Sequence, residues 1–216
     1  MQVLDVGDDF IELEPVPVAS PTSSAAAALG RSLAAMHAAG APAFGSPPEG
    51  WEGPAWIGRQ AQTNDPEPTW GRFYAEQRVR PFVHAAERVG HLDGREVRAL
   101  DDLCDHIAAG AFDDGRPPAR IHGDLWSGNV LWTGDGACLI DPAAHGGHGL
   151  TDLAMLSLFG APGLERVLDS YAEAASLPGG WRDLIGLHQL HPLAVHAVSH
   201  GPSYGDKLVA VARRYR

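Results

Sequence analysis

The order of apolar and polar positions predicts a short β-hairpin at the start of the chain. Apolar residues are frequent in two runs, residues 2–6 and 10–13, and the Gly-Asp-Asp stretch at 7–9 between them favours a tight turn. The Glu-Pro-Val-Pro stretch at 14–17 follows directly. Proline has no backbone N–H and cannot continue a strand ladder or a helix interior, so these residues are predicted to form a connector.

Apolar positions that recur every three or four residues predict helices over most of the remaining chain. The segment 41–69 is rich in Pro, Gly and Trp, and it is predicted to be ordered over a surface. Around 121–140 the pattern changes to short β-branched and aliphatic runs, which predict strands between loops. The predicted helices span 25–39, 70–89, 94–109 and the chain from 151 onward, including one buried helix over 184–205, a stretch without Asp, Glu, Lys or Arg.

The charge of the chain argues against two classes of partner. Sixteen Lys and Arg residues against 27 Asp and Glu residues leave a formal net charge of -11 at pH 7. An acidic surface repels phosphate backbones and anionic lipid headgroups, so neither nucleic acid nor a membrane is expected as a partner.

The N-terminus lacks the features of a secretory signal, and Cys104 and Cys138 have no CxxC spacing. Both observations favour a cytoplasmic location.

Residues 122–129, HGDLWSGN, carry the most specific chemical signal. Asp124 is followed five residues later by Asn129, the spacing found in catalytic loops of phosphoryl transferases. A short predicted hairpin over 130–140 then brings Asp141 back beside Asn129. An acceptor hydroxyl needs a positioned base, and Mg²⁺ prefers carboxylate and amide oxygens. The pattern therefore predicts Asp124 as the base, with Asn129 and Asp141 as ligands of the Mg²⁺ that accompanies ATP.

These residues resemble the fructosamine kinase or ketosamine-3-kinase family, which is related to the aminoglycoside phosphotransferases and more distantly to protein kinases. The resemblance is carried by HGDLWSGN, LIDPA, GH and DLAM, and it extends over nearly all of residues 3–215. It implies an α+β, protein-kinase-like fold with a mostly helical C-terminal lobe. The implied divisions are a remnant hairpin of the N-terminal lobe at 1–14, a hinge at 15–19, and the helical lobe at 20–216, with a catalytic loop at 121–129 and a metal-binding segment at 141–152.

The resemblance also implies an activity: ATP-dependent phosphorylation of the sugar 3-hydroxyl of a ketosamine of the fructosamine or ribulosamine type. The product is unstable and releases the amine, so the implied role is deglycation. Adenine is expected to contact the backbone carbonyl of Glu14 and the backbone amide of Val16. Trp126 and His148 are the candidate substrate contacts, although the resemblance also explains His148 as a structural histidine.

Further residues are assigned supporting roles. His122 is expected to hydrogen-bond the backbone near Asp141, and Asp152 is expected to support the catalytic loop or to cap the helix that follows. Three tryptophans, Trp51, Trp56 and Trp70, are candidates for a platform under a sugar ring, although core or lid packing is the commoner role of tryptophan.

Two parts of a complete kinase site are missing from the sequence. No glycine-rich strand precedes the hinge, and the single lysine, Lys207, follows all of the motifs. We therefore expect an N-terminal lobe that is largely missing, through a misplaced start or a true truncation, and a chain that alone is weakly active or inactive. The uncovered edge of the hairpin favours self-association. Two alternatives stay open: a non-catalytic pseudokinase-like binding protein, and an aminoglycoside or other small-alcohol phosphotransferase.

Overall fold

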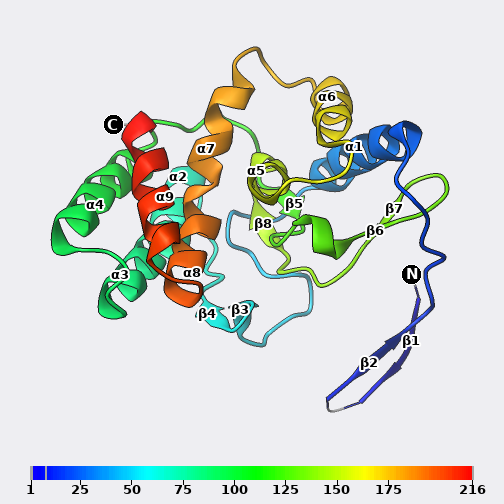
Figure 1. Ribbon diagram of the computed structural model, residues 1–216, viewed down its shortest axis with the longest axis horizontal. Helices are drawn as coiled ribbons and strands as arrows, with labels where there is room; N and C mark the ends of the chain where they lie inside the picture. The colour runs from blue at the N-terminus through cyan, green and yellow to red at the C-terminus, as the bar shows by residue number, and fades with distance from the viewer. Residues whose placement is uncertain (1, 8, 216) are drawn as a thin grey trace.

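The predicted N-terminal hairpin is present in the computed structural model, which describes residues 2–7 and 9–215. Strands β1 (Val3–Val6) and β2 (Ile11–Leu13) pair antiparallel, and Asp8 of the predicted turn lies outside the described residues. Figure 1 shows the hairpin extending away from the helical body. Its exposed apolar side chains are Val3, Leu4, Val6, Phe10 and Ile11. Pairing of this edge with another chain stays a prediction, as do the lobe and hinge boundaries.

The connector and the first helix are confirmed. Neither helix nor strand is present between Leu13 and helix α1 (Ser23–Ala38). The hydroxyl of Thr22 caps this helix by accepting the backbone N–H of Ala25 at 3.1 Å. The apolar face of α1 packs against helix α6 (Leu164–Ala174) and shares one core cluster with helix α5 (Leu150–Phe159).

Gly30 marks a close approach between α1 and α6, because a Cβ added at this position would overlap the carbonyl oxygen of Val167. Alanine normally stabilises a helix interior relative to glycine by about 1 kcal/mol. Here we expect Gly30→Ala to lower the free energy of unfolding by about 1–3 kcal/mol, since the added methyl group must push the two helices apart. Chemical denaturation measures the change. Gly179→Ala is the control, because its Cβ has no neighbour within 4 Å; a stabilised Gly30→Ala protein would contradict the close packing.

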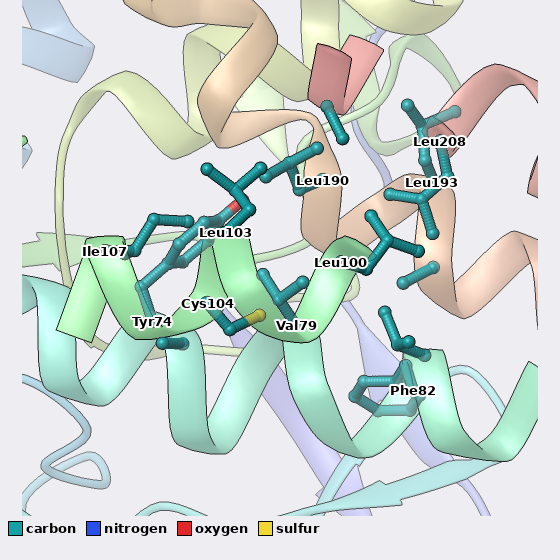
Figure 2. Packing of buried hydrophobic residues seen from close by; sticks show 14 of the residues in the cluster. Tyr74, Val79, Phe82, Leu100, Leu103, Cys104, Ile107, Leu190, Leu193 and Leu208 are labelled. Carbon is teal, nitrogen blue, oxygen red and sulfur yellow. The ribbon is translucent and has the colours of Figure 1, made fainter. Parts of the chain in front are cut away.

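The predicted helix over 70–89 is continuous and contains a π-helical stretch. Its three consecutive parts are α2 (Trp70–Phe73), η1 (Tyr74–Val79) and α3 (Arg80–Arg88). Together with helix α4 (Gly94–Ala108) they form the largest part of the apolar cluster in Figure 2. The side chain of Tyr74 lies within this cluster, and its hydroxyl donates to the carbonyl of Leu187 at 2.9 Å.

Two side chains of the π-helical stretch hold residues 63–65. Gln77 accepts the backbone N–H of Asp65 at 3.0 Å and donates to its carbonyl at 2.9 Å. The buried guanidinium of Arg78 donates to the carbonyl of Thr63 and to Oδ1 of Asn64, both at 2.6 Å. Hydrogen bonds from Gln77 and Arg78 therefore fix the backbone of residues 63–65 to the helical core.

The strands form two-stranded sheets only, among the residues that the structure describes. Besides β1–β2, two of these sheets are hairpins: β3 (Ala55–Ile57) with β4 (Gln60–Gln62), which was not predicted, and β6 (Val130–Trp132) with β7 (Ala137–Leu139), which was. In the fourth sheet, β5 (Ala119–Ile121) pairs with β8 (His145–Gly147). This pairing joins the chain before the catalytic loop to the chain after Asp141.

The prediction of one buried helix over 184–205 was wrong. This stretch contains helix α7 (Ile185–His188), helix α8 (Leu190–Ser199) and the start of helix α9 (Pro202–Ala212). The break after α8 falls at His200 and Gly201, and Pro202 begins the next helix because its missing N–H costs nothing in a first turn. Short 3-10 turns, η3 (Trp181–Leu184) and η4 (Arg213–Tyr215), flank these helices.

In the described part of the chain, no helix combines the length and the apolar character needed to cross a membrane.

Candidate active site

The loop after β5 and the hairpin that follows bring Asp124, Asn129 and Asp141 together. The side-chain N–H groups of Asn129, which ends the short 3-10 turn η2 (Ser127–Asn129), donate to the carbonyl of Asp124 at 2.9 Å and to that of Asp141 at 3.5 Å. The backbone N–H of Ile140 donates to the carbonyl of Asn129 at 3.1 Å. Since the amide nitrogen of Asn129 is occupied by these carbonyls, its amide oxygen is the atom left to bind a cation.

Two residues in the left-handed backbone region frame this loop. Gly123, with φ of 83°, turns the chain directly before Asp124, and a Cβ there would overlap the carbonyl of Ala143. Asp141 has φ of 52°, one of two positive values among the described non-glycine residues. A non-glycine residue in this region costs free energy and occurs often at functional sites. The geometry of Asp141 therefore favours a function for its carboxylate.

Asp152, in the first turn of α5, fixes the backbone of the catalytic loop. Its completely buried carboxylate accepts the backbone N–H of His122 at 2.8 Å and that of Gly123 at 2.9 Å. It also pairs with Nε2 of His37 at 3.0 Å, and Nδ1 of the same ring lies 2.7 Å from the hydroxyl of Tyr171. A chain of hydrogen bonds thus runs from α6 through α1 to the loop that carries Asp124.

Charges and hydrogen bonds keep the Asp152 carboxylate ionised although it is buried. Burial alone would raise the pKa of Asp152, but the hydrogen bond and charge of His37, together with the N–H of His122, outweigh it and lower the pKa. Burial and the charge of Asp152 raise the pKa of Tyr171, so its hydroxyl stays protonated, and its oxygen lies 2.7 Å from Nδ1 of His37. Sequence reasoning placed Asp152 near the loop but missed His37 and Tyr171.

His122 makes the contact that the sequence predicts. Its Nε2 lies 2.8 Å from the carbonyl of Ile140, directly before Asp141, and its Nδ1 lies 3.3 Å from the backbone N–H of Asp124. With a proton on Nε2, the ring donates to the carbonyl of Ile140, and its Nδ1 accepts the N–H of Asp124. The imidazole therefore spans the gap between the loop of Asp124 and the end of β7.

The surroundings of the half-buried Asp124 make its carboxylate a stronger base than usual. Burial is the main reason that the pKa of Asp124 is raised, and the negative charges of Asp152 and Asp141 act in the same direction. The nearby His122 and Asn129 oppose this shift without cancelling it. A raised pKa suits a group that must take a proton from a hydroxyl.

Asp124 opens onto a cavity of about 650 Å³, within the range of ligand sites that hold a sugar with a substituent. The walls come from the β3–β4 hairpin, the catalytic loop, α5 and one face of α8. Trp126, 44% exposed, lines the cavity beside Asp124, and its contact to substrate stays a prediction. The remaining lining residues are Ile57, Gly58, Arg59, Gln60, Met155, Phe159, His191, Pro192, Val195, His196, Ser199 and His200.

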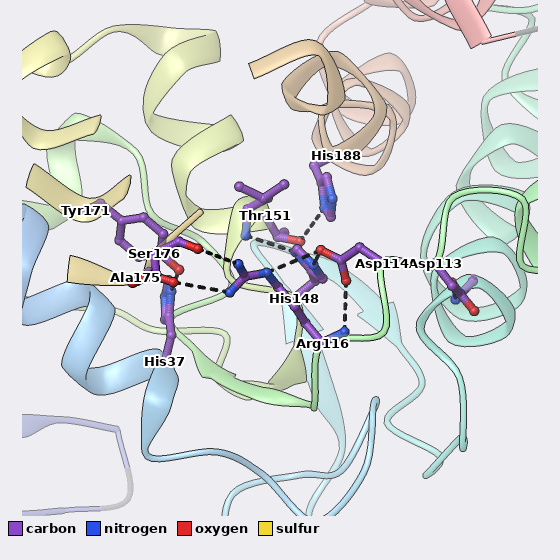
Figure 3. A network of polar contacts seen from close by, with 12 residues as sticks. His37, Asp113, Asp114, Arg116, His148, Thr151, Tyr171, Ala175, Ser176 and His188 are labelled. Atoms are coloured by element: carbon purple, nitrogen blue, oxygen red, sulfur yellow. Dashed lines mark hydrogen bonds and ion pairs between the residues drawn. The ribbon is translucent and has the colours of Figure 1, made fainter. Parts of the chain in front are cut away.

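His148, the other candidate substrate contact, lies outside this cavity lining and is buried. Its Nε2 lies 3.2 Å from Oδ2 of Asp114 (Figure 3). Its Nδ1 accepts the backbone N–H of Leu150. Burial would raise the pKa of Asp114, but the hydrogen bond from His148 and the nearby Arg116 lower it to about 2. Both ring nitrogens of His148 are thus used inside the protein, which fits the structural role, and we leave it out of the proposed substrate contacts.

The tryptophan platform does not form as a unit. Trp70 is buried and stacks on Tyr74 with ring centres 4.8 Å apart, so it belongs to the core. Trp51 and Trp56 are each 52% exposed and line a separate cavity of about 320 Å³ beside Pro142. The three rings therefore do not form a common platform, and Trp70 has the core-packing role that was expected as the commoner one.

The predicted hinge runs close to the hairpin that follows the catalytic loop. The backbone N–H of Ala19 donates to the carbonyl of Trp132 at the end of β6, at 2.8 Å. Glu14 and Val16 precede this contact and do not line the cavity that contains Asp124. Their predicted contacts to adenine would therefore lie outside this cavity.

The donor atoms at the loop fit magnesium better than a transition metal. The described residues contain no cluster of three or more His, Cys, Asp and Glu side chains suited to a metal ion. Mg²⁺ needs only one or two protein carboxylates, because phosphate and water oxygens complete its shell. The exposed carboxylate of Asp141 and the amide oxygen of Asn129 are hard oxygen donors of this kind.

A mostly helical body that carries an Asp-x-x-x-x-Asn loop, with a second aspartate returned beside it, defines a kinase-like protein. The sequence model of the family described as "Fructosamine kinase" matches residues 4–215. The chain therefore belongs to the fructosamine kinase family, and its relatives are phosphotransferases by name.

Individual relatives agree with this membership. A "probable ketoamine kinase" of Enterococcus faecium is 30% identical over 181 residues, 83% of this chain and 63% of the relative. The ketosamine-3-kinase of Mus musculus is 29% identical over 153 residues, 70% of this chain and 48% of the relative. The chain thus spans less than two thirds of either curated relative.

Solved structures of the family superpose on the chain. The crystal structure of a "putative fructosamine-3-kinase" from Thermobifida fusca is 48% identical, with a TM-score of 0.90 over 99% of this chain and 72% of that one. A second "putative fructosamine-3-kinase", from Haemophilus somnus, is 20% identical with a TM-score of 0.76, covering 95% of this chain and 68% of that one. The second supports the fold alone.

Proposed function

We propose that the protein transfers the γ-phosphoryl group of ATP to the sugar 3-hydroxyl of a ketosamine. The observation that carries this proposal is the meeting of Asp124, Asn129 and Asp141 at one loop that opens onto a ligand-sized cavity. Asp124 accepts the proton of the hydroxyl while the sugar oxygen forms its bond to phosphorus and the bond to the ADP oxygen breaks. Asn129 and Asp141 hold Mg²⁺, which when bound neutralises charge on the phosphate oxygens.

Two further contacts belong to this proposal. Membership of the family supports contacts of adenine with the backbone of Glu14 and Val16, and the exposed ring of Trp126 in the cavity lining supports a contact with the acceptor. His122 and Asp152 are positioning residues, because they hold the loop backbone and the end of β7 without lying in the cavity lining. Phosphorylation of the sugar destabilises its bond to the amine, so the proposed role is deglycation.

The charge of the cavity favours a ketosamine over an aminoglycoside. Asp124 is the only carboxylate among the described residues that line the cavity, and the rest of the lining is mainly apolar, aromatic or imidazole. An aminoglycoside carries several ammonium groups, each of which needs a carboxylate or carbonyl partner when it loses water. A ketosamine carries one amine, so its burial is less costly here.

The test is a comparison of acceptors with MgATP. We expect fructosyl- or ribulosyl-amines to yield ADP and a phosphate ester on O3 of the sugar, and kanamycin to yield neither. A coupled assay measures ADP, phosphorus NMR locates the ester, and Asp124→Asn protein controls for background hydrolysis. An ester on kanamycin alone would support the aminoglycoside alternative, whereas calorimetric binding of MgATP and ketosamine without any ester would support the pseudokinase alternative.

A further inference from the structure

The cavity beside Asp124 contains one side chain with a permanent positive charge. Arg59 is the only arginine or lysine among the described residues that line it. Of the three lining histidines, His191 and His196 are neutral near pH 7, because burial is the main reason that their pKa values are lowered. The cavity therefore presents one anion, Asp124, where the hydroxyl must react, and one cation, Arg59, on a different element.

The β3–β4 hairpin fixes the backbone of Arg59. Ile57 pairs with Gln60 at the end of the hairpin, which leaves Gly58 and Arg59 as a two-residue turn. Gly58 has φ of 55°, the left-handed conformation that a type II′ turn requires at its first central position. The side chain of Ile57 is buried in the core cluster, so the turn is anchored at the cavity wall.

The exposed guanidinium of Arg59 makes no ion pair or hydrogen bond with the described residues. The paired arginines, Arg72, Arg80, Arg116 and Arg182, all lie on other elements. The five N–H donors of Arg59 are consequently available to a ligand in the cavity. Their planar arrangement matches the two oxygens of a carboxylate.

We propose that Arg59 pairs with a carboxylate on the amine half of the substrate, so that the preferred substrates are ketosamines formed by amino acids with a free carboxylate. This inference rests on the proposed function, since the sugar of the same molecule must reach Asp124. A cavity of about 650 Å³ has room for a sugar and an amino-acid substituent together. No bond changes at Arg59; it orients the substrate and adds affinity.

The test uses a matched pair of substrates, fructosyl-glycine and fructosyl-glycinamide, which differ in the charge of the group that Arg59 would bind. Wild-type protein is expected to prefer the acid over the amide by about 3- to 30-fold in kcat/KM, the effect of one partly exposed charge-assisted pair. In Arg59→Gln protein the acid-to-amide ratio should fall to about one, through a higher KM for the acid. Arg59→Lys should retain part of the preference.

Arg95→Gln removes an exposed arginine on α4, outside the cavity lining, and should leave the acid-to-amide ratio at the wild-type value. Calorimetric titration with both compounds measures the same preference when turnover is slow. An Arg59→Gln protein that loses acid and amide conversion equally would show that Arg59 serves the phosphates or the hairpin, which overturns the inference. Equal use of acid and amide by wild-type protein overturns it too, while the proposed function stands. If neither compound binds or reacts, both proposals are overturned.

Discussion

Replacement of Asp124 by asparagine is expected to lower kcat for phosphoryl transfer by about 10²- to 10⁴-fold, the contribution of a general base. Asparagine keeps the size of the side chain but cannot take the proton of the acceptor hydroxyl. The Kd for MgATP should change little, because the proposed contacts to adenine and metal come from other residues. Steady-state kinetics and calorimetry measure the two quantities. Asp135→Asn, in the exposed turn between β6 and β7, is the matched control and should leave both unchanged.

The pH dependence of the same reaction is an independent test. Burial, with the charges of Asp152 and Asp141, raises the pKa of Asp124, and only the ionised carboxylate can act as base. As the pH is lowered, the kcat/KM of wild-type protein should therefore decrease. The midpoint of this decrease should lie above about 3.9, the ordinary pKa of aspartate. Residual activity of Asp124→Asn should lack this acid limb. An unchanged kcat in the variant, or an acid limb that persists in it, would remove Asp124 from the role of base.

The parts of the site that the sequence predicts are those separated by short stretches of chain. Asn129 meets Asp124 because five residues form one tight loop, and Asp141 returns because the β6–β7 hairpin closes on itself. The contact of His122 with the carbonyl of Ile140 follows from the same closure. In each case a turn of known geometry sets the distance, so residue spacing carries the information.

The parts that escaped prediction depend on contacts between distant elements. His37 follows an apolar helical pattern, and nothing in its spacing reveals that Asp152, 115 residues later, is its partner. Strand β8 consists of His145, Gly146 and Gly147, a composition unfavourable for strands, and it forms because β5 supplies a partner. The only hint in the sequence was a histidine within an apolar helical pattern, which needs a polar partner once it is buried. That partner, Asp152 on α5, becomes evident only when the structure brings the two residues together.

Asp152 connects the stability of the protein to the shape of its candidate active site. One carboxylate accepts two loop N–H groups and pairs with His37, all without access to water. Because the two N–H groups belong to the residues immediately before Asp124, a change at Asp152 moves the base itself. Tyr171 touches only the outer nitrogen of His37, so it shares the packing but not the contact with the loop.

Asp152→Asn is accordingly expected to lower the free energy of unfolding by about 3–5 kcal/mol, the cost of breaking a buried charge pair. It should also lower kcat more than it raises the KM for either substrate, because an amide N–H group then faces loop N–H donors and displaces Asp124. Tyr171→Phe is the control; it removes one outer hydrogen bond and should cost about 1 kcal/mol with kcat nearly unchanged. Chemical denaturation and steady-state kinetics of the two variants separate the effects.

The destabilisation by Asp152→Asn should depend on pH with a definite sign. The pKa of Asp152 is lower in the folded protein than in the unfolded chain, where it is about 3.9. Its stabilising contribution is therefore complete above that pH and is lost as the pH falls toward the folded-state value. The difference in unfolding free energy between wild-type and Asp152→Asn protein should be largest near neutral pH and shrink below about pH 4. A difference that grows as the pH falls toward 4 would mean that the buried carboxyl is protonated in the folded protein and that His37 holds a neutral partner, and a constant difference would mean that folding does not shift its pKa.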